Sequence, residues 1–386
     1  MIRVTVRARP GHPWVFANEI VDPPVASLPP GDQVEVVDPA GRLLGRAYAN
    51  PQSLITLRFV ARGAVDIDAP ALYVERLAEA VALRRRLLPS RRSYRVVAGE
   101  ADGLPGFILD RYEDVVVAQI TTLGMERRRH LLEAAVREVI APRGAMLRND
   151  VASRVLEGLE GDNAVWFGDV PDRVAFDENG VKLVADVREG QKTGFFFDQA
   201  ENRRFLAERC DGARVLDLYA HSGAWALGAL LHGASHALAV DVSGPACATI
   251  EENASLNGVQ DRLEVWAADA RDALARIQSE RRRFDVVCVD PPAFAKSRKK
   301  AGIALSAYRA VNTEALRCVA PGGLFFTSSC SHHVLAERFE EAVESAAVRA
   351  GRRLLRVRKG GQAPDHPVLP GVPETEYLKH LVYLVR

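Results

Sequence analysis

Residues 213–292 repeat one pattern four times: a short apolar run, a carboxylate at or near its end, and then a stretch with helical character. The runs are "ARVLDLYA", "HALAVDVS", "LEVWAADA" and "FDVVCVDPPAF". Strands that are buried on both faces read as continuous apolar runs, and strands that alternate with helices indicate a parallel sheet. The pattern therefore predicts an open α/β sheet of the Rossmann type for this part of the chain.

The carboxylates constrain the function as well as the fold. They are Asp217, Asp241, Asp269 and Asp290, and Tyr219 stands two residues after the first. In an open α/β sheet a ligand binds across the carboxyl ends of the strands, so these side chains converge on one crevice. Each aspartate alone is explained equally well as a cap of the next helix. Four of them at the same place in the repeat instead favour a binding site rich in acids.

The turn after the first strand separates two classes of ligand. A dinucleotide site would need a G-x-G-x-x-G turn that brings backbone amides onto a pyrophosphate. The turn "AHSGAW" offers one well-placed glycine, Gly223. S-adenosylmethionine carries no phosphate but has a positive sulfonium, an amino group and hydroxyl donors, all of which suit carboxylates. The pattern therefore favours S-adenosylmethionine as the cofactor.

The chain has 386 residues, which is too long for one ordinary domain, and its texture changes twice. Residues 1–63 alternate short apolar runs with turns such as "DPPVASLPPGD", which is typical of a small all-β unit. Residues 66–170 mix helical periodicity with strands and predict an α+β middle domain. Residues 171–386 then hold the α/β domain, which opens on a β-hairpin.

Local signals predict individual elements within this frame. Helical periodicity runs over residues 69–88 and again over about 125–140. Asn179-Gly180 stands between two alternating runs and is the strongest short hairpin signal in the chain. The closing "TEYLKHLVYLVR" predicts the last strand of the α/β sheet.

Composition bears on compartment and partners. The chain has 51 Lys and Arg against 50 Asp and Glu, so its net charge of +1 gives no argument for nucleic acid. The N-terminus lacks the apolar core of a signal peptide, and no stretch approaches the ~20 apolar residues that span a bilayer. Five cysteines without C-x-x-C or Cys/His ligand spacing fit a reducing compartment. We therefore expect a cytoplasmic protein with no membrane segment and no metal.

One cysteine differs from the others in its setting. Cys330, in "FFTSSCSHHV", directly follows a run that reads as a buried strand, and a helix is expected next. Amides at a helix N-terminus favour a thiolate, and flanking serines and histidines argue against burial, so Cys330 is the candidate nucleophile. The cysteines that read as small buried hydrophobes are Cys210, Cys247, Cys288 and Cys318.

Several motifs together resemble a known family. "GQKTGFFFDQAENR", "VLDLYAHSGAWAL", "AVDVS", "FDVVCVDPPAFAKS", "TSSCSHH" and "APDHP" occur in the order found in bacterial large-subunit ribosomal RNA cytosine-C5 methyltransferases, the ribosomal RNA large subunit methyltransferase I family. "GHPWVF" is similar to the opening of their PUA domain, and "GEADGLPGFILDRY" to their middle domain. The resemblance covers essentially the whole chain. It implies a PUA-like RNA-binding barrel, an α+β middle domain and a class I methyltransferase domain whose closing strand is antiparallel.

The resemblance also implies roles in a cofactor pocket. Residues 192–203 would form a lid, Asp241 would lie at the ribose, and Asp269 at the adenine. Asp290-Pro291-Pro292 would face the target base. The cofactor-binding residues implied in this way are Lys192, Phe197, Asp198, Gln199, Asn202, Arg203, Asp217, Tyr219, Ser222, Gly223, Asp241, Asp269, Asp290, Pro291 and Pro292.

Methylation at C5 explains why a cysteine is needed. C5 of cytosine is not nucleophilic in the aromatic ring, and addition of a thiolate to C6 makes C5 enamine-like, so that it attacks a sulfonium methyl group. We expect Cys330 as that thiolate and Asp290 as the residue that holds the flipped base through N3 and the exocyclic amine. The side chains expected to contact 23S ribosomal RNA are Arg7, Arg9, His12, Lys296, Arg298 and Lys299.

Two other functions stay open at this point. A guanine-nitrogen methyltransferase acting on ribosomal RNA would use a similar Asp-Pro-Pro loop and would be indifferent to Cys330. A non-catalytic RNA-binding assembly factor could keep the fold without binding the cofactor. The sequence names neither the modified nucleotide nor the base that removes the C5 proton, and it leaves open a homodimer.

Overall fold

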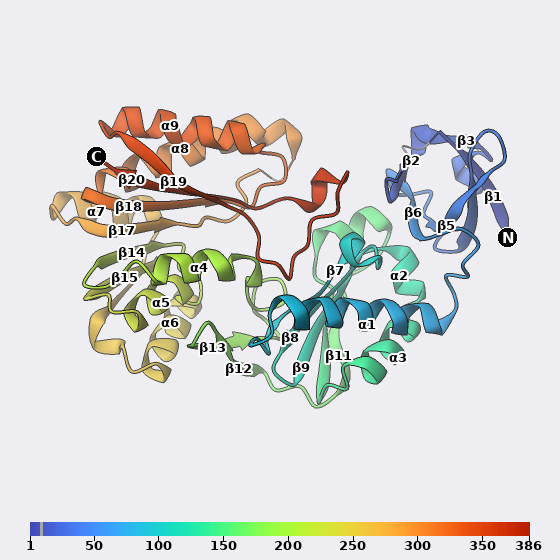
Figure 1. The fold of residues 1–386 in the computed structure, drawn as a ribbon, viewed down its shortest axis with the longest axis horizontal. Coiled ribbons are helices and arrows are strands. Elements are labelled where there is room, and N and C mark those ends of the chain that lie inside the picture. Colours follow the sequence, from blue (N-terminus) through green and yellow to red (C-terminus); the bar gives the residue numbers. More distant parts are fainter. Residues whose placement is uncertain (8–10, 296) are drawn as a thin grey trace. The chain divides into compact units, whose positions relative to one another are not determined.

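The structure is a computed structural model that describes residues 1–7, 11–295 and 297–386 (Figure 1). The described residues divide into two compact units, between which the chain passes several times. Unit 1 consists of Met1–Phe176, Ala185–Phe197 and Pro364–Thr375, and unit 2 consists of Asp177–Val184, Asp198–Ala363 and Glu376–Arg386. The three domains expected from the sequence, with their boundaries, remain a prediction, since this division groups residues 1–176 together.

The first sheet of unit 1 is all-β, as expected for the N-terminal residues. The described residues there form six strands in the order β2-β6-β5-β4-β1-β3. Alternate strand residues such as Val4, Val34, Val36 and Leu57 form its buried core. The strands are β1 (Ile2–Val6), β2 (Trp14–Phe16), β3 (Ile20–Asp22), β4 (Gln33–Val37), β5 (Leu43–Ala49) and β6 (Ile55–Arg62).

The second sheet of unit 1 packs with helices, which makes this part α+β as predicted. Its described strands have the order β11-β10-β9-β8-β7, and α1 and α3 contribute Leu77, Val81 and Val136 to the core that the sheet shares. The elements are α1 (Pro70–Leu87), β7 (Tyr94–Ala98), β8 (Phe107–Tyr112), β9 (Val115–Ile120), α2 (Leu123–Arg127), α3 (Arg129–Val139), β10 (Gly144–Arg148) and β11 (Asn163–Gly168).

One local prediction for this region is wrong. The helix expected over about 125–140 is broken into α2 and α3 at Arg128. The guanidinium of Arg128 is buried and donates to the carbonyl oxygens of Gly31 and Gly124, at 2.8 and 2.9 Å, so a distant contact fixes the break. Strand β11, with the sequence "NAVWFG", lies in a stretch for which no element was predicted.

Unit 2 contains the predicted open α/β sheet. The described residues form seven strands in the order β16-β15-β14-β17-β18-β20-β19. The first five are parallel, and β20 runs antiparallel to both of its neighbours, as expected for the closing strand. The strands are β14 (Arg214–Leu218), β15 (His236–Asp241), β16 (Leu263–Ala267), β17 (Phe284–Val289), β18 (Val319–Ser329), β19 (Leu354–Gly360) and β20 (Lys379–Val385).

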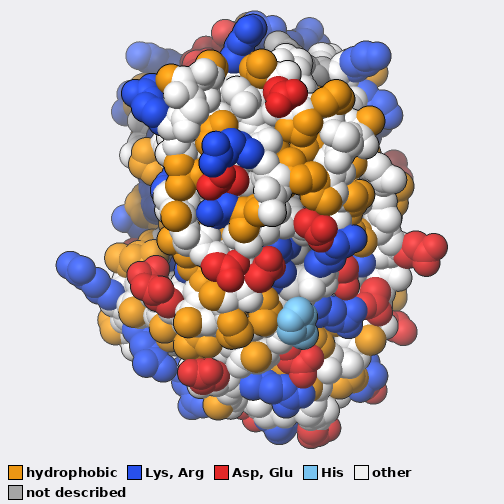
Figure 2. All heavy atoms as spheres, turned by 90° about the vertical axis from the view of Figure 1, so that its right-hand side faces the viewer, with side chains coloured by type: hydrophobic (Ala, Val, Ile, Leu, Met, Phe, Trp, Pro, Cys, Tyr) orange, Lys and Arg blue, Asp and Glu red, His pale blue; other side chains and the backbone are white. Residues whose placement is uncertain are grey.

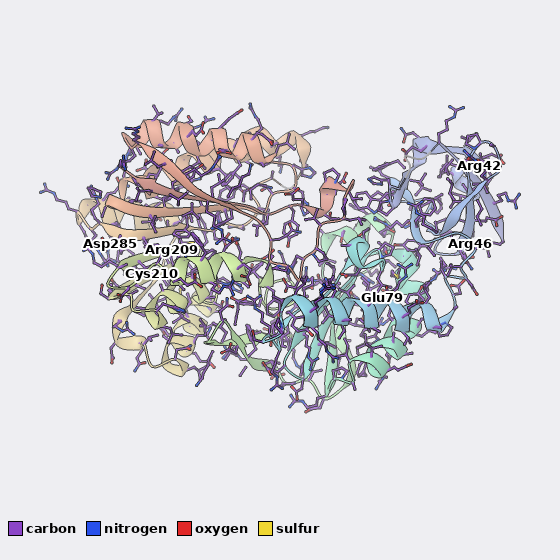
Figure 3. All side chains as sticks on the ribbon, viewed as in Figure 1. Arg42, Arg46, Glu79, Arg209, Cys210 and Asp285 are labelled. Carbon is purple, nitrogen blue, oxygen red and sulfur yellow. The ribbon has the colours of Figure 1, made fainter. Side chains whose placement is uncertain are left out.

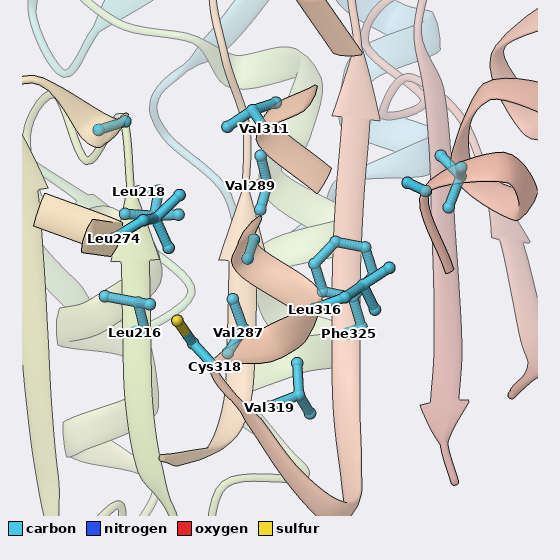
Figure 4. Packing of buried hydrophobic residues seen from close by; sticks show 14 of the residues in the cluster. Leu216, Leu218, Leu274, Val287, Val289, Val311, Leu316, Cys318, Val319 and Phe325 are labelled. Carbon is cyan, nitrogen blue, oxygen red and sulfur yellow. The ribbon is translucent and has the colours of Figure 1, made fainter. Parts of the chain in front are cut away.

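Helices cover both faces of this sheet. Residues of α7, α8 and α9 pack with the strands in one buried cluster, in which Figure 4 shows Cys318 beside Leu216, Val287 and Val319. Figure 1 shows α4, α5 and α6 on the other side. The helices are α4 (Ala200–Ala207), α5 (Ala224–Leu231), α6 (Gly244–Leu256), α7 (Ala270–Ser279), α8 (Ala301–Arg317) and α9 (Ala336–Ala350). The strand order reverses between β14 and β17, which is where open α/β sheets bind their ligands.

The predicted hairpin is present as β12 (Arg173–Glu178) and β13 (Val181–Asp186). Its two turn residues, Asn179 and Gly180, have φ angles of 54° and 84°. A two-residue hairpin turn of the I′ type needs positive φ at both positions, which Asn-Gly adopts at low cost.

Candidate active site

Side chains singled out in the sequence gather at one edge of the unit 2 sheet. Asp217 lies near the end of β14, Asp241 is the last residue of β15, and Asp290 directly follows β17. Cys330 directly follows β18, the parallel neighbour of β17. Because the carboxyl ends of parallel strands share an edge, these groups surround the point where the strand order reverses.

Asp269 lies at the same edge of the sheet, where its side chain caps the following helix. It lies two residues after β16 and is the N-cap of α7, where its carboxylate accepts from the backbone N–H of Arg271 at 2.8 Å. The helix-capping alternative raised by the sequence is therefore realised at this position. Asp269 as a whole is exposed to solvent.

The turn between β14 and α5 is held in an unusual backbone conformation. Tyr219, His221 and Gly223 have φ angles of 65°, 53° and 77°, in the left-handed region. A Cβ on Gly223 would lie 2.9 Å from Cγ2 of Ile250, so both conformation and space require glycine. Asp241 stabilises the turn, since its carboxylate accepts from the backbone N–H of His221 at 2.9 Å. Strain of this kind is concentrated at functional sites.

Asp217 is a buried carboxylate with unused hydrogen-bonding capacity. It is fully buried, and its Oδ2 accepts from the backbone N–H of Ala226 at 3.2 Å. Its Oδ1 has no hydrogen-bond partner among the described residues. Burial raises the pKa of Asp217 to about 8, with the charges of Asp290 and Asp241 acting in the same direction. A buried oxygen without a partner indicates a missing donor, such as that of a bound ligand.

Both oxygens of Asp290 accept hydrogen bonds from neighbouring helices. Gln199 donates to Oδ1 at 2.9 Å, and the indole N–H of Trp225 donates to Oδ2 at 3.2 Å. Loss of solvent raises the pKa of Asp290 to about 6, and the nearby charge of Asp198 adds to this effect. The two prolines that follow differ, since Pro291 is buried and Pro292 is exposed.

A buried polar network extends behind Asp290. Gln199 also donates to the hydroxyl of Ser328 at 3.0 Å, and Ser328 is hydrogen-bonded to Nδ1 of His380 at 2.8 Å. The ring of His380 stacks on Trp225, with centroids 5.7 Å apart. Asn202 donates to Oε1 of Gln199 at 2.7 Å. Sequence reasoning missed Trp225, Ser328 and His380; the one local signal for them is the polar His380 inside an apolar strand.

The segment expected to form a lid is divided between the two units. Lys192 and Phe197 belong to unit 1, where Lys192 lies over the ring of Phe196 at 4.5 Å. Asp198, Gln199, Asn202 and Arg203 belong to unit 2 and are buried. Arg203 forms a two-pronged ion pair with Glu178, at 2.6 and 2.8 Å, and Asp198 accepts from the hydroxyl of Tyr377 at 2.6 Å. The roles of these residues toward a cofactor remain a prediction.

Cys330 lies in a different place from the one its sequence suggested. Helix α9 begins at Ala336, so Cys330 does not stand at a helix N-terminus, and the expectation that helix amides favour its thiolate is wrong. The neighbouring Ser329 and Ser331 are fully buried and hydrogen-bonded to the hydroxyl of Tyr308, at 3.0 and 2.9 Å. Cys330 itself is half-buried. Of these three consecutive residues, Cys330 is therefore the one whose side chain solvent reaches.

The other four cysteines are buried, in agreement with the sequence. Cys210, labelled in Figure 3, lies after α4 with its thiol 3.1 Å from the carbonyl oxygen of Leu206. Cys288 lies inside β17, and burial raises its thiol pKa well above the ordinary value. A thiol in such a setting stays protonated and unreactive. Cys330 is thus the cysteine with access to a substrate.

The side chains expected to contact RNA differ in accessibility. Arg7 and Lys299 are exposed, whereas His12 is 4% exposed and its Nδ1 accepts from the backbone N–H of Trp14. Arg9, Lys296 and the side chain of Arg298 lie outside the described part of the chain. RNA contacts by all six remain a prediction.

Among the described residues, no three His, Cys, Asp or Glu side chains are arranged to hold a metal ion. In the same part of the chain, every helix is too short or too polar to cross a bilayer.

Comparison with known proteins adds to this geometry. Two family models match the sequence: a PUA-like domain over residues 3–62 and Conserved hypothetical protein 95 over residues 196–353. Ribosomal RNA large subunit methyltransferase I of Shewanella denitrificans is 35% identical, with 98% of each chain covered. The enzyme of the same name from Photobacterium profundum is 36% identical, with 97% of this chain and 96% of its own covered.

Solved structures share the fold. A Streptococcus mutans protein assigned as a SAM-dependent methyltransferase has a TM-score of 0.85 and 19% identity, with both chains covered completely. The same values hold for a methyltransferase solved in complex with SAH. The expected combination of a PUA-like N-terminal domain with a Rossmann-like methyltransferase domain is therefore confirmed as the fold.

Proposed function

The chain belongs to the ribosomal RNA large subunit methyltransferase I family, and from that premise we propose that it methylates C5 of a cytosine in 23S ribosomal RNA through a covalent Cys330 adduct. S-adenosylmethionine is the methyl donor in this proposal, and RNA is the partner. The observation that carries it is the placement of Cys330 and Asp290 at the ends of the neighbouring strands β18 and β17.

The residues at the sheet edge fit the cofactor. S-adenosylmethionine supplies an electrophilic methyl group on a positively charged sulfur. The unpartnered Oδ1 of Asp217 is a buried acceptor for a cationic or hydroxyl donor, and the turn at Gly223 allows close approach of a ligand to the backbone. Asp241 and Asp269, one at the end of β15 and one after β16, would bind the ribose and the adenine. Asp198, Gln199, Asn202 and Arg203 of the same unit would complete the proposed pocket.

The cytosine chemistry assigns separate tasks to the two catalytic residues. The Cys330 thiolate adds to C6, a C–S bond forms, and the electron pair of the C5–C6 double bond becomes available at C5. C5 would then take the methyl group from the sulfonium of S-adenosylmethionine, whose S–CH3 bond would break to leave S-adenosylhomocysteine. The C5 proton would pass to a base or to solvent, and the C–S bond would break to return the thiolate. Asp290 holds the base through N3 and the exocyclic amine during these steps. Lys299, exposed in the short 3-10 helix before α8, would add affinity through phosphate.

Covalent trapping tests the proposal. RNA with 5-fluorocytosine at the target should remain attached to the protein in a denaturing gel, because fluorine replaces the proton that must leave C5. Cys330→Ala should abolish both the adduct and methylation. Cys288→Ala is the matched control and should cost only packing, on the order of 1 kcal/mol.

The outcomes separate the alternatives. Methylation that survives in Cys330→Ala would exclude the C5 mechanism and favour methylation of a guanine nitrogen. Absence of S-adenosylmethionine binding by calorimetry would favour a non-catalytic RNA-binding factor. Mapping of 5-methylcytosine in ribosomal RNA from cells with and without the gene would identify the modified nucleotide.

A further inference from the structure

A nucleophilic thiol needs a group that favours its anion, and α9 begins too far along the chain to supply it. The strand next to β18 offers a candidate. Strand β20 runs antiparallel to β18, with Lys379 directly opposite Ser329, the residue before Cys330. Lys379 is half-buried in this position. It therefore brings a cationic side chain to the strand end that carries the thiol.

Two backbone carbonyls fix the ammonium group of Lys379. Its Nζ donates to the carbonyl oxygens of Ser331 and Tyr377, each at 2.7 Å. Ser331 directly follows Cys330, so the ammonium group of Lys379 contacts the backbone next to the thiol residue. An ammonium group has three N–H donors, and these two contacts use two of them. Two hydrogen bonds to backbone carbonyl oxygens therefore fix the position of the Lys379 ammonium group.

A thiolate at Cys330 would act on Lys379. Burial lowers the pKa of Lys379 to about 8, and negative charge on Cys330 and then on Glu376 acts against this shift. Other titratable groups described nearby include Tyr308 on α8, and His332 and Tyr377, which lie after β18 and before β20. Burial raises the pKa of Tyr308, so it stays neutral and adds no charge near the thiol. The ring of His332 lies 5.2 Å from that of Tyr377.

We propose that Lys379 is a positioning residue that holds Cys330 as a thiolate before it attacks the base. The thiol proton leaves to solvent, and Lys379 keeps its three protons while its charge stabilises the anion. This inference rests on the proposed function for its relevance to methylation. The claim that Lys379 lowers the pKa of the Cys330 thiol can be measured without RNA.

The test measures thiolate formation at Cys330 directly. The rate of iodoacetamide alkylation of Cys330 would be followed by mass spectrometry of its peptide in the full-length protein between pH 5.5 and 10. Lys379→Gln keeps N–H donors for both carbonyls but removes the charge, and it should slow alkylation about tenfold at pH 7. The rate at high pH should be unchanged, because the thiolate then forms without help. Lys379→Arg keeps a charge and should restore most of the rate at pH 7.

Control variants make the outcomes distinct. Lys359→Gln, at an exposed position of β19 in the same sheet, should leave the profile unchanged. If Lys379→Gln lowers the melting temperature but leaves the midpoint of the alkylation profile in place, Lys379 has a structural role and the inference is overturned. If the midpoint moves while Cys330→Ala still methylates RNA, the thiolate assignment stands and the proposed C5 mechanism fails.

Discussion

Four aspartates share one edge of the sheet but differ in what surrounds their carboxylates. Asp241 accepts from two backbone N–H groups, those of His221 and Ser243, each at 2.9 Å. Asp269 caps a helix and is exposed. The pKa values of Asp217 and Asp290 are raised by burial to about 8 and about 6. Groups whose ionisation is disfavoured in this way are poised to change charge when a ligand binds.

Asp217→Asn should stabilise the protein and weaken cofactor binding. The folded-state pKa of Asp217 lies near 8, above the ordinary value of 3.8, so the folded protein holds this proton more tightly than the unfolded chain. Its stabilisation is complete below pH ~4 and is lost as pH rises through 8. The neutral amide avoids that loss, and the free energy of unfolding at pH 8 should rise on the order of 2 to 5 kcal/mol.

Denaturant titrations at several pH values would measure this gain, which should shrink toward pH 4. The affinity for S-adenosylmethionine should fall about tenfold or more, because an amide cannot become the charged acceptor that a cationic ligand would favour. A variant that is no more stable at pH 8 would contradict the raised pKa of Asp217. A variant with full cofactor affinity would contradict its place in the pocket.

Trp225→Phe should raise the pKa of Asp290. The indole N–H favours the charged carboxylate, so its removal should move the titration upward from about 6 by roughly half a unit to one unit. The substitution keeps an aromatic ring beside His380. Carboxyl carbon NMR of labelled aspartate would follow the titration. Trp166→Phe in unit 1 is the control and should leave it unchanged, whereas a lower pKa in Trp225→Phe would show that the hydrogen bond is not formed.

At the scale of elements, the turn between β14 and α5 is the most constrained connection of the site. Gly223→Ala combines a positive φ of 77° with a Cβ only 2.9 Å from Ile250, and should destabilise the protein by about 1 to 3 kcal/mol. Cofactor affinity should fall as well, because the turn lines the proposed pocket. Thermal unfolding and calorimetry would measure both quantities.

Gly244→Ala provides the comparison for that variant. Gly244 begins α6, and an added Cβ there meets nothing within 4 Å. Its stability and cofactor affinity should therefore stay close to those of the wild type. Equal effects of the two substitutions would contradict the prediction that the turn at Gly223 tolerates an added Cβ less well than the start of α6.

The sequence predicted the elements that depend on local chemistry. The hairpin at Asn179-Gly180 and the strand ends at Asp241 and Asp290 follow from turn residues and apolar runs, which act over a few positions. The buried polar network did not follow, because Gln199 and Trp225 reach Asp290 across 91 and 65 residues of chain. The distance from Cys330 to α9 was also misjudged, since "SHHVL" has no strong signal for where a helix begins.

At the scale of the whole molecule, the N-terminal sheet is tied to the α+β part of unit 1 by buried polar contacts. The hydroxyl of Tyr48 donates to Oγ1 of Thr122 at 3.0 Å, and Asn50 donates to the carboxylate of Glu157 at 2.7 Å. The indole of Trp14 donates to Glu100 at 2.8 Å, so this tryptophan is engaged within the protein. Figure 2 shows basic and acidic side chains interspersed over the face that it presents. RNA affinity would then depend on local contacts and shape.

Deletion of residues 1–63 should lower RNA affinity about tenfold or more, because we expect the PUA-like domain to contribute phosphate contacts but no chemistry. It should also destabilise the rest of unit 1, since Thr122 and Glu157 lose partners that are buried with them. Binding of S-adenosylmethionine should persist, because the proposed pocket residues from Asp198 onward lie in unit 2. Gel-shift assays, limited proteolysis and calorimetry would measure the three effects.

The deletion is expected to lower both RNA affinity and stability, and Tyr48→Phe separates these two effects. This variant keeps the N-terminal sheet but removes the hydrogen bond to Thr122, so it should lower stability by about 1 kcal/mol and leave RNA affinity unchanged. RNA affinity that falls equally in both variants would mean that instability, and not lost contact, explains the effect of the deletion. Undiminished RNA affinity after the deletion would place RNA recognition elsewhere, because the affinity would then come from residues beyond the N-terminal sheet, such as Lys299.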